Sequence, residues 1–356
     1  MTPLRKIQFG HGSRNGPRLV TKASPLALSI QPKNTGFASL GDTPRAVMFL
    51  CAALFIFSFQ DVMVKLLSDR YPAHQIVFVR AIIALPLMFM IVHYESGLGT
   101  LATRHPFMHA IRSFIGFGAF FFYYLALATM PLTAVVAIWF TSPLFITALA
   151  VPILGERVGW RRWAGILFGF AGALVIVQPG AETFQPAAFL PIFAALCYAV
   201  SALMGRKMGI TESGSVMAFY MMITFFYMGG ILGIILAHIP VPEGTTGTLK
   251  ALMLPWRMPI GIEFAMLVLI GVISSVGFWL IATAYRIGSS PTVAPFEYTA
   301  MIWAIILSFL LWGEVPKATT LLGAAMIVIS GIYVLKREAA VRDRPLAGRG
   351  TWRSRN

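Results

Sequence analysis

The sequence has few charged residues and very few cysteines for its length. Only 12% of its 356 residues are Asp, Glu, Lys or Arg, against about 25% in soluble globular domains. The net charge of +15 would suggest a nucleic-acid partner in a soluble protein, but the scarcity of charge argues against that class. The two cysteines, Cys51 and Cys197, both fall in apolar stretches, which predicts small buried side chains and no disulfide.

Several sequence motifs of catalysis and energy coupling are also missing. There is no Gly-rich phosphate loop ending in Lys-Ser or Lys-Thr, so no ATP drive is predicted. The six histidines form no cluster with acidic residues or cysteines at metal-ligand spacing, and no Ser-His-Asp set is recognisable. We therefore expect no cofactor, no resident metal and no enzymatic activity.

What the sequence has in abundance is long apolar stretches. A membrane-spanning helix needs about 20 mostly apolar residues. Ten stretches approach or reach that length: Ala46–Leu67, His74–Tyr94, Pro106–Ala128, Leu132–Leu154, Trp163–Gln178, Ala187–Gly205, Ser215–His238, Ile262–Tyr285, Pro291–Trp312 and Ala318–Leu335. The predicted fold class is an all-α polytopic membrane protein with ten transmembrane helices, a lipid bilayer as its surroundings and no soluble catalytic domain.

The basic residues predict the orientation of these spans. With both termini assigned to the cytoplasm, 21 of the 28 Lys and Arg residues lie inside and four outside, an asymmetry that the positive-inside rule favours. Residues 1–45 and 336–356 are basic and are expected to be cytoplasmic tails. We expect the first tail to be disordered, with an organellar transit segment or an over-long gene start as alternatives. The predicted location is a bacterial inner membrane.

The two halves of the chain carry related sequence at an offset of 158 residues. The dipeptide Gly155-Glu156 recurs as Gly313-Glu314, and Gly165 as Gly323. Five spans per half is an odd number, so a second copy would enter the membrane upside down. This predicts an inverted repeat of 46–178 and 187–335, a construction typical of secondary transporters.

At the level of motifs the chain resembles the EamA-type, ten-helix branch of the drug/metabolite transporter superfamily. The resemblance covers about 46–337 and includes the tripeptide Pro143-Leu144-Phe145 and the Gly-Glu turns. Within that branch it is similar to bacterial S-adenosylmethionine uptake proteins, through Asp61-Val62-Met63-Val64-Lys65, Phe78-Val79-Arg80 and Ala294-Pro295-Phe296-Glu297-Tyr298. Glu297 departs from this pattern, because a basic residue often precedes the Tyr in relatives.

Ionisable side chains inside the spans are the main candidates for a substrate site. Each costs about 2.5–3.5 kcal/mol at a helix centre on insertion scales, so it should face a cavity or a partner. Asp61 and Lys65 share one helical face, either as a polar path lining or as a self-neutralising pair. The guanidinium of Arg80 suits carboxylate recognition or a fixed tie between helices. Glu297, beside Pro291 and Pro295, could take a cationic group or a proton.

Aromatic residues and glycines complete the candidate positions. Trp139, which matches Glu297 at the offset of 158, and Tyr298 could stack on an aromatic or cationic ligand, or could pack in the core. Gly165, Gly169 and the glycine at 323 permit close helix approach, and favour helix packing or a homodimer over ligand contact.

The predicted function is a secondary transporter that moves a small polar or zwitterionic metabolite across the membrane by alternating access. The expected substrate is amino-acid-like, and the resemblance implies S-adenosylmethionine as one member of that class. An exporter of hydrophobic cations or drugs is the second hypothesis, and an integral-membrane enzyme acting on a lipid-soluble substrate is the third.

Overall fold

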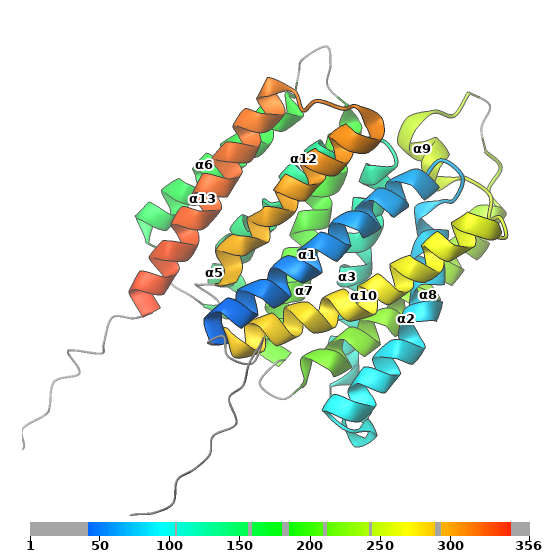
Figure 1. Cartoon of the computed structure of the whole chain (residues 1–356), viewed down its shortest axis with the longest axis horizontal. Helices are drawn as coiled ribbons and strands as arrows, with labels where there is room; N and C mark the ends of the chain where they lie inside the picture. Colours follow the sequence, from blue (N-terminus) through cyan, green and yellow to red (C-terminus); the bar gives the residue numbers. More distant parts are fainter. Residues whose placement is uncertain are drawn as a thin grey trace, which may run out of the picture. The chain divides into compact units, whose positions relative to one another are not determined.

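The computed structural model describes residues 42–103, 105–155, 159–179, 185–208, 212–241, 244–288 and 293–342. Within these ranges every regular element is a helix, and no strand occurs (Figure 1). The described residues belong to one compact unit, Leu40–Asn356. The tail 1–41, Glu156 of the first Gly-Glu turn and Pro291 lie outside the described residues.

Ten segments are long and apolar enough to cross a membrane, which confirms the predicted fold class. They are built from α1 (Asp42–Leu67), α2 (Ala73–Glu95), α3 (Pro106–Leu127), α4 (Leu132–Trp139) with α5 (Ser142–Leu154), α6 (Trp160–Val177), α7 (Phe189–Met208), α8 (Gly214–Ala237), α10 (Gly261–Ile287), η4 (Ala294–Tyr298) with α12 (Thr299–Trp312), and α13 (Ala318–Arg342). The 3₁₀ turn η3 (Pro186–Ala188) leads directly into α7 within the sixth span, and the short helices η2 (Leu98–Leu101) and α9 (Gly247–Leu252) lie in connections. The last helix continues past the predicted Leu335, because Lys336–Arg342 contains no Gly or Pro to end it.

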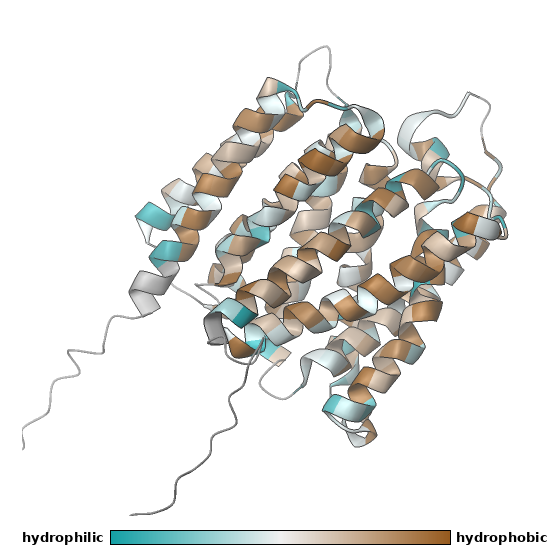
Figure 2. Cartoon of the chain, in the orientation of Figure 1, coloured by the Kyte–Doolittle hydropathy of each residue, from teal (hydrophilic) through white to brown (hydrophobic). Residues whose placement is uncertain are grey.

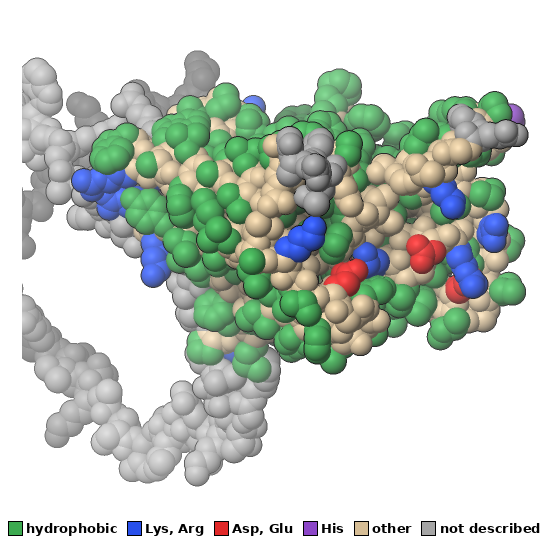
Figure 3. All heavy atoms as spheres, turned by 90° about the horizontal axis from the view of Figure 1, so that it is seen from above, with side chains coloured by type: hydrophobic (Ala, Val, Ile, Leu, Met, Phe, Trp, Pro, Cys, Tyr) green, Lys and Arg blue, Asp and Glu red, His purple; other side chains and the backbone are tan. Residues whose placement is uncertain are grey.

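The outer surface of the helices is suited to lipid. Figure 2 shows hydrophobic residues along most of the helical length, with hydrophilic residues mainly toward the helix ends. Large apolar side chains such as Leu167, Ile234 and Leu310 are more than half exposed. In Figure 3 most coloured side chains are hydrophobic, and acidic side chains lie near basic ones. Such a surface is stable in hydrocarbon and would aggregate in water, so the protein is an integral membrane protein.

Two of the ten spans are interrupted within the membrane. The predicted span Leu132–Leu154 is divided, with α4 ending at Trp139 and α5 beginning at Ser142. Pro143 explains the break, because it lacks the N–H that would bond to the carbonyl of Trp139 in a continuous helix. The ninth span begins with the 3₁₀ segment η4, which contains Pro295, before α12 continues it.

Glycines in left-handed conformation end both interrupted spans. Gly155 ends α5 with φ of 70°, and Gly313 ends α12 with φ of 64°. This region of backbone space suits glycine, which has no Cβ to clash with the carbonyl. The two glycines are separated by the repeat offset of 158 residues, so the two interrupted spans have the same sequence of break, helix and cap.

A close helix approach joins α6 to α13 through glycines. A Cβ atom added to Gly172 would lie 2.7 Å from the carbonyl oxygen of Gly323, and one added to Gly323 would lie 2.4 Å from the carbonyl oxygen of Gly172. Gly165 and Gly169 pack against side chains of α13 in the same contact. These glycines therefore serve helix packing inside one chain, one of the two roles expected of them, and the homodimer stays a prediction. The other extensive helix pairs are α1 with α10, α2 with α8, and α3 with α7.

Replacing Gly172 by Ala is expected to destabilise the protein by about 1–3 kcal/mol, the usual cost of overpacking a tight contact. The added methyl would collide with backbone, which cannot move aside as a side chain can. The thermal unfolding midpoint in detergent measures the effect. Gly99→Ala is the control, because an added Cβ there meets nothing within 4 Å and Gly99 is not among the glycines with positive φ. Equal midpoints for the two variants would contradict this account of the α6–α13 contact.

Candidate functional site

A cavity of about 300 Å³ lies inside the bundle. Its walls come from α1, α3, α7, α10 and both interrupted spans. The polar lining consists of Ser58, Gln60, Asp61, Ser142 and Glu297. Aromatic rings supply much of the remaining wall, from Phe57, Phe120, Tyr123, Tyr124, Trp139, Phe140, Tyr198, Phe278 and Tyr285. A mostly apolar space with a few polar groups is typical of a small-molecule site.

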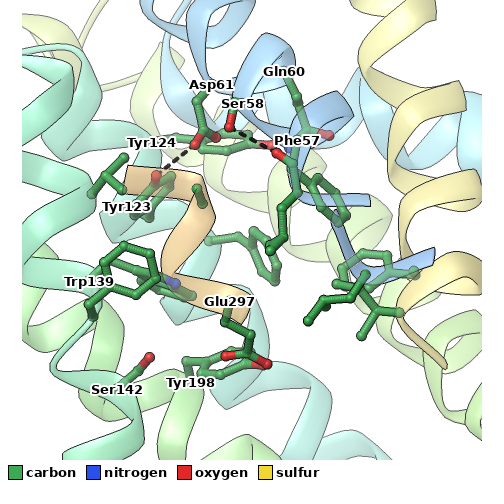
Figure 4. Close-up of a pocket in the computed structure, with 18 of the residues that line it drawn as sticks. Phe57, Ser58, Gln60, Asp61, Tyr123, Tyr124, Trp139, Ser142, Tyr198 and Glu297 are labelled. Atoms are coloured by element: carbon green, nitrogen blue, oxygen red, sulfur yellow. Dashed lines mark hydrogen bonds between the residues drawn. The ribbon is translucent and has the colours of Figure 1, made fainter. Parts of the chain in front are cut away.

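Asp61 presents a carboxylate at one side of this cavity. It lies on α1, and its Oδ2 accepts a hydrogen bond from the hydroxyl of Tyr123 at 2.8 Å (Figure 4). The other predicted member of the pair, Lys65, turns away from it. The Lys65 Nζ donates to the carbonyl oxygen of Met130 at 2.7 Å and lies 5.5 Å from the ring centroid of Trp312. Each charge therefore has its own partner, and Lys65 is absent from the cavity lining.

Glu297 supplies the second carboxylate of the cavity, from the 3₁₀ segment at the start of the ninth span. Its Oε1 accepts a hydrogen bond from the hydroxyl of Tyr285 on α10. In Figure 4, Glu297 lies across the cavity from Asp61, next to Tyr198. Two acidic groups thus face one enclosed space from different helices.

The interruptions of the spans place these groups. Trp139 is the last residue of α4, and Ser142 is the first residue of α5, so the break itself forms part of the cavity wall. Glu297 lies in the corresponding irregular segment of the ninth span. Irregular backbone at membrane depth is tolerated where protein or a water-filled cavity satisfies its polar groups, which matches the position of both breaks.

Trp139 forms the centre of an aromatic wall. Its ring centroid lies 5.0 Å from that of Tyr123 and 5.0 Å from that of Tyr198. Figure 4 shows it between the level of Asp61 and that of Glu297. A flat, electron-rich wall between two carboxylates can hold a positively charged or aromatic group by cation–π contact and stacking.

Arg80 lies one layer behind the cavity wall and is fully buried. Its Nη1 donates to the hydroxyl of Tyr124 at 2.5 Å, while Nε and Nη2 have no hydrogen-bond partner among the described residues. Aromatic rings surround the guanidinium carbon, with centroids at 4.7 Å for Phe120, 5.5 Å for Phe225 and 5.8 Å for Phe278. Two of these rings, Phe120 and Phe278, separate it from the cavity that they line.

Tyr298 occupies the core on the other side of the ninth span. Its ring centroid lies 5.0 Å from that of Phe140, and its hydroxyl points at Gly331 of α13, where an added Cβ would overlap it. It does not line the cavity. Six residues were predicted from the sequence to form the substrate site. The structure brings three of them to one cavity, Asp61, Trp139 and Glu297. The other three, Lys65, Arg80 and Tyr298, lie outside its lining.

Comparison with known proteins supports the functional class that this geometry suggests. A model of the EamA-like transporter family matches residues 44–178 and again 185–336. The chain belongs to the EamA-like transporter family. Small-molecule transport in a lipid bilayer is therefore the function of this chain, and the cavity is the candidate substrate site of an EamA-like transporter.

Three curated relatives illustrate the range of the family. The chain is 28% identical to the S-adenosylmethionine uptake transporter of Rickettsia bellii, over 81% of this chain and 92% of that one. It is 30% identical to the riboflavin transporter of Vibrio cholerae, over 72% and 83% of the two chains. It is 27% identical to the pseudopaline exporter of Pseudomonas aeruginosa, over 80% and 94%.

A solved crystal structure shares the fold, with a TM-score of 0.58 at 18% sequence identity. The superposition covers 83% of this chain and 99% of the other. At this identity the match shows the architecture of the helices alone.

Sequence reasoning did not select two tyrosines that take part in the site, Tyr198 and Tyr285. Both lie in predicted spans, and a phenol inside an apolar span was the available signal. That signal was weak, because Tyr220 and Tyr227 also lie in predicted spans and do not line the cavity. Only the fold shows which hydroxyl meets a carboxylate. Tyr285 bonds to Glu297, whereas Tyr220 bonds to the carbonyl of Leu101 outside the cavity.

Removing the hydroxyl of Tyr124 should destabilise this EamA-like transporter by about 2 kcal/mol, because Arg80 would lose its hydrogen bond in a site that water does not reach. Tyr124→Phe keeps the ring that lies 5.7 Å from the guanidinium. The thermal midpoint measures the loss, with Tyr94→Phe as control, since Tyr94 is 81% exposed. A midpoint as high as that of the control would show that the bond contributes nothing.

Proposed function

We propose that the protein transports a positively charged, amino-acid-like metabolite and that S-adenosylmethionine is such a substrate. The observation that carries the proposal is the charge of the cavity. Asp61 and Glu297 both line it, and none of the described residues that line it is Lys or Arg. A cationic group can pair with these carboxylates, and an isolated carboxylate in an apolar site is otherwise costly.

The chemistry of S-adenosylmethionine matches the groups around the cavity. Its sulfonium and ammonium centres provide two positive charges for Asp61 and Glu297, and its adenine ring can stack on Trp139. Its carboxylate can accept hydrogen bonds from the hydroxyls of Ser142 and Tyr198, both in the lining. A neutral ring system such as riboflavin would leave both acids without a charged partner, so it fits less well.

Arg80 adds specificity in this proposal from behind the wall. Its guanidinium carbon lies 4.7 Å from the ring centroid of Phe120 and 5.8 Å from that of Phe278, so its positive charge acts on the cavity through rings that line it. A purely lipophilic cation would gain nothing from that charge, whereas a substrate with a carboxylate would. This favours a cationic amino acid derivative as the substrate over a drug-like cation, which is the second candidate substrate. We also propose that the protein binds and releases its substrate without converting it chemically.

We infer that transport occurs by alternating access of two inverted five-helix halves, 46–178 and 187–335. The two family-model matches support this division. The helix contacts support it too, because exchanging the halves converts the α1–α10 pair into the α7–α3 pair and leaves the α2–α8 and α6–α13 pairs unchanged. The excess of Lys and Arg in the tails and in the loops on the same side as the termini supports cytoplasmic termini in a bacterial inner membrane.

The test is counterflow of radiolabelled S-adenosylmethionine in proteoliposomes, which detects transport in either direction. We expect exchange by the wild-type protein and a loss of at least about tenfold in Asp61→Asn and in Glu297→Gln, because each removes one half of a buried charge pair. Glu263→Gln is the matched control, since Glu263 pairs with Arg70 outside the cavity.

Three outcomes would contradict the proposal. Normal exchange by Glu297→Gln or Asp61→Asn would remove that carboxylate from the substrate site. Inhibition by lipophilic cations, without exchange of or inhibition by any amino acid or adenosylated amino acid, would favour the drug exporter. Chemical turnover of a lipid-soluble substrate without flux would favour the membrane enzyme.

A further inference from the structure

A second concave site, separate from the cavity, lies on the outer surface between α2 and α10. It is a groove of about 520 Å³. Apolar side chains from both helices form its walls, among them Leu87, Ile91, Val272 and Val276. The substrate proposal makes no use of it.

Charged residues close one end of this groove. Glu95 is the last residue of α2, and Arg286 is the last but one of α10. The Arg286 Nη1 lies 3.0 Å from the Glu95 Oε1, and both side chains stay accessible, at 62% and 31% of their surface. The neighbouring Tyr94 is 81% exposed, a position typical of the boundary between lipid and water.

The dimensions fit a lipid that enters from the bilayer. Leu87 precedes Glu95 by eight residues, so the apolar wall of α2 extends about 12 Å from the charged end. Trp279, which precedes Arg286 by seven residues on α10, adds a flat surface to the groove. A ligand with an apolar tail and a polar head would bury its tail against both helices and keep its head at the charged pair.

We propose that this groove binds one phospholipid whose headgroup carries both a phosphate and a primary ammonium. The guanidinium of Arg286 can donate two hydrogen bonds to the phosphate, and the carboxylate of Glu95 can accept from the ammonium. A purely anionic headgroup would meet the carboxylate at close range. A quaternary ammonium would bring charge but no hydrogen to donate. The site therefore selects phosphatidylethanolamine over phosphatidylglycerol, with phosphatidylcholine between them.

Native mass spectrometry of the delipidated full chain, with the three lipids added in equal amounts, measures this order directly. We expect phosphatidylethanolamine to bind about twofold to fivefold tighter than phosphatidylglycerol, the range that accessible charge pairs produce. Glu95→Gln should abolish the preference for phosphatidylethanolamine over phosphatidylglycerol, and Arg286→Gln should weaken the binding of both of these lipids.

The matched control is Arg70→Gln. Arg70 forms a similarly accessible ion pair with Glu263, 2.6 Å apart, and does not line the groove. Its lipid preference should equal that of the wild type. Val276→Trp fills the groove without changing any charge, and should reduce binding of all three lipids.

The proposal is overturned if the wild type shows no preference, or if the preference survives in Glu95→Gln. It is also overturned if Val276→Trp, folded to the same thermal midpoint as Arg70→Gln, binds phosphatidylethanolamine as the wild type does. None of these results bears on the substrate of the transporter, because the readout is lipid bound and not solute moved.

Discussion

The free energy of removing charge from water is the constraint on which this architecture depends. A carboxylate or guanidinium at membrane depth needs a partner, a hydrogen-bond donor or access to a cavity. Asp61 has Tyr123, Glu297 has Tyr285, and Lys65 has the backbone carbonyl of Met130, so three charges in the spans each have one hydrogen bond to another segment of the chain. The Arg80 guanidinium is less completely satisfied, because its Nε and Nη2 have no hydrogen-bond partner among the described residues.

The same constraint explains where the helices break. A spanning helix satisfies its own backbone, and a break in lipid would expose polar groups. Both interruptions border the internal cavity, so the break that opens space for a substrate also meets polar side chains there. Pro143 and Pro295 set the positions, because neither can donate the next helical hydrogen bond. The glycine at the end of each interrupted span then turns the chain toward the next one.

Much of the fold could be predicted from hydropathy and charge alone. The ten spans and the all-helical class depend on local composition, which is legible in one sequence. The division at Trp139 and Ser142 was less accessible, because a proline such as Pro86 lies within α2 without dividing it. Which glycines pair, as Gly172 with Gly323, depends on contacts 151 positions apart in the sequence, and pattern alone could not distinguish them from a dimer interface.

The site could be predicted only in part, for the same reason. Asp61 and Glu297 stood out because charge is rare in spans, and the structure brings both to one cavity. Lys65 shares a helical face with Asp61, but four residues move it by a full turn, toward Met130 and Trp312. Tyr298 follows Glu297 directly and points into the core, because adjacent residues of a helix face different neighbours. Single-helix geometry predicts which residues share a face, but not what that face meets.

The most direct measurement of the central claim is calorimetric binding of S-adenosylmethionine and S-adenosylhomocysteine to the purified protein. The two molecules share the adenosine and amino acid parts, and the second lacks only the methyl group that makes the sulfur cationic. If the carboxylates of Asp61 and Glu297 recognise positive charge, S-adenosylmethionine should bind at least about tenfold tighter than S-adenosylhomocysteine, a difference of about 1.4 kcal/mol in binding free energy. Equal affinities, or tighter binding of S-adenosylhomocysteine, would contradict the account.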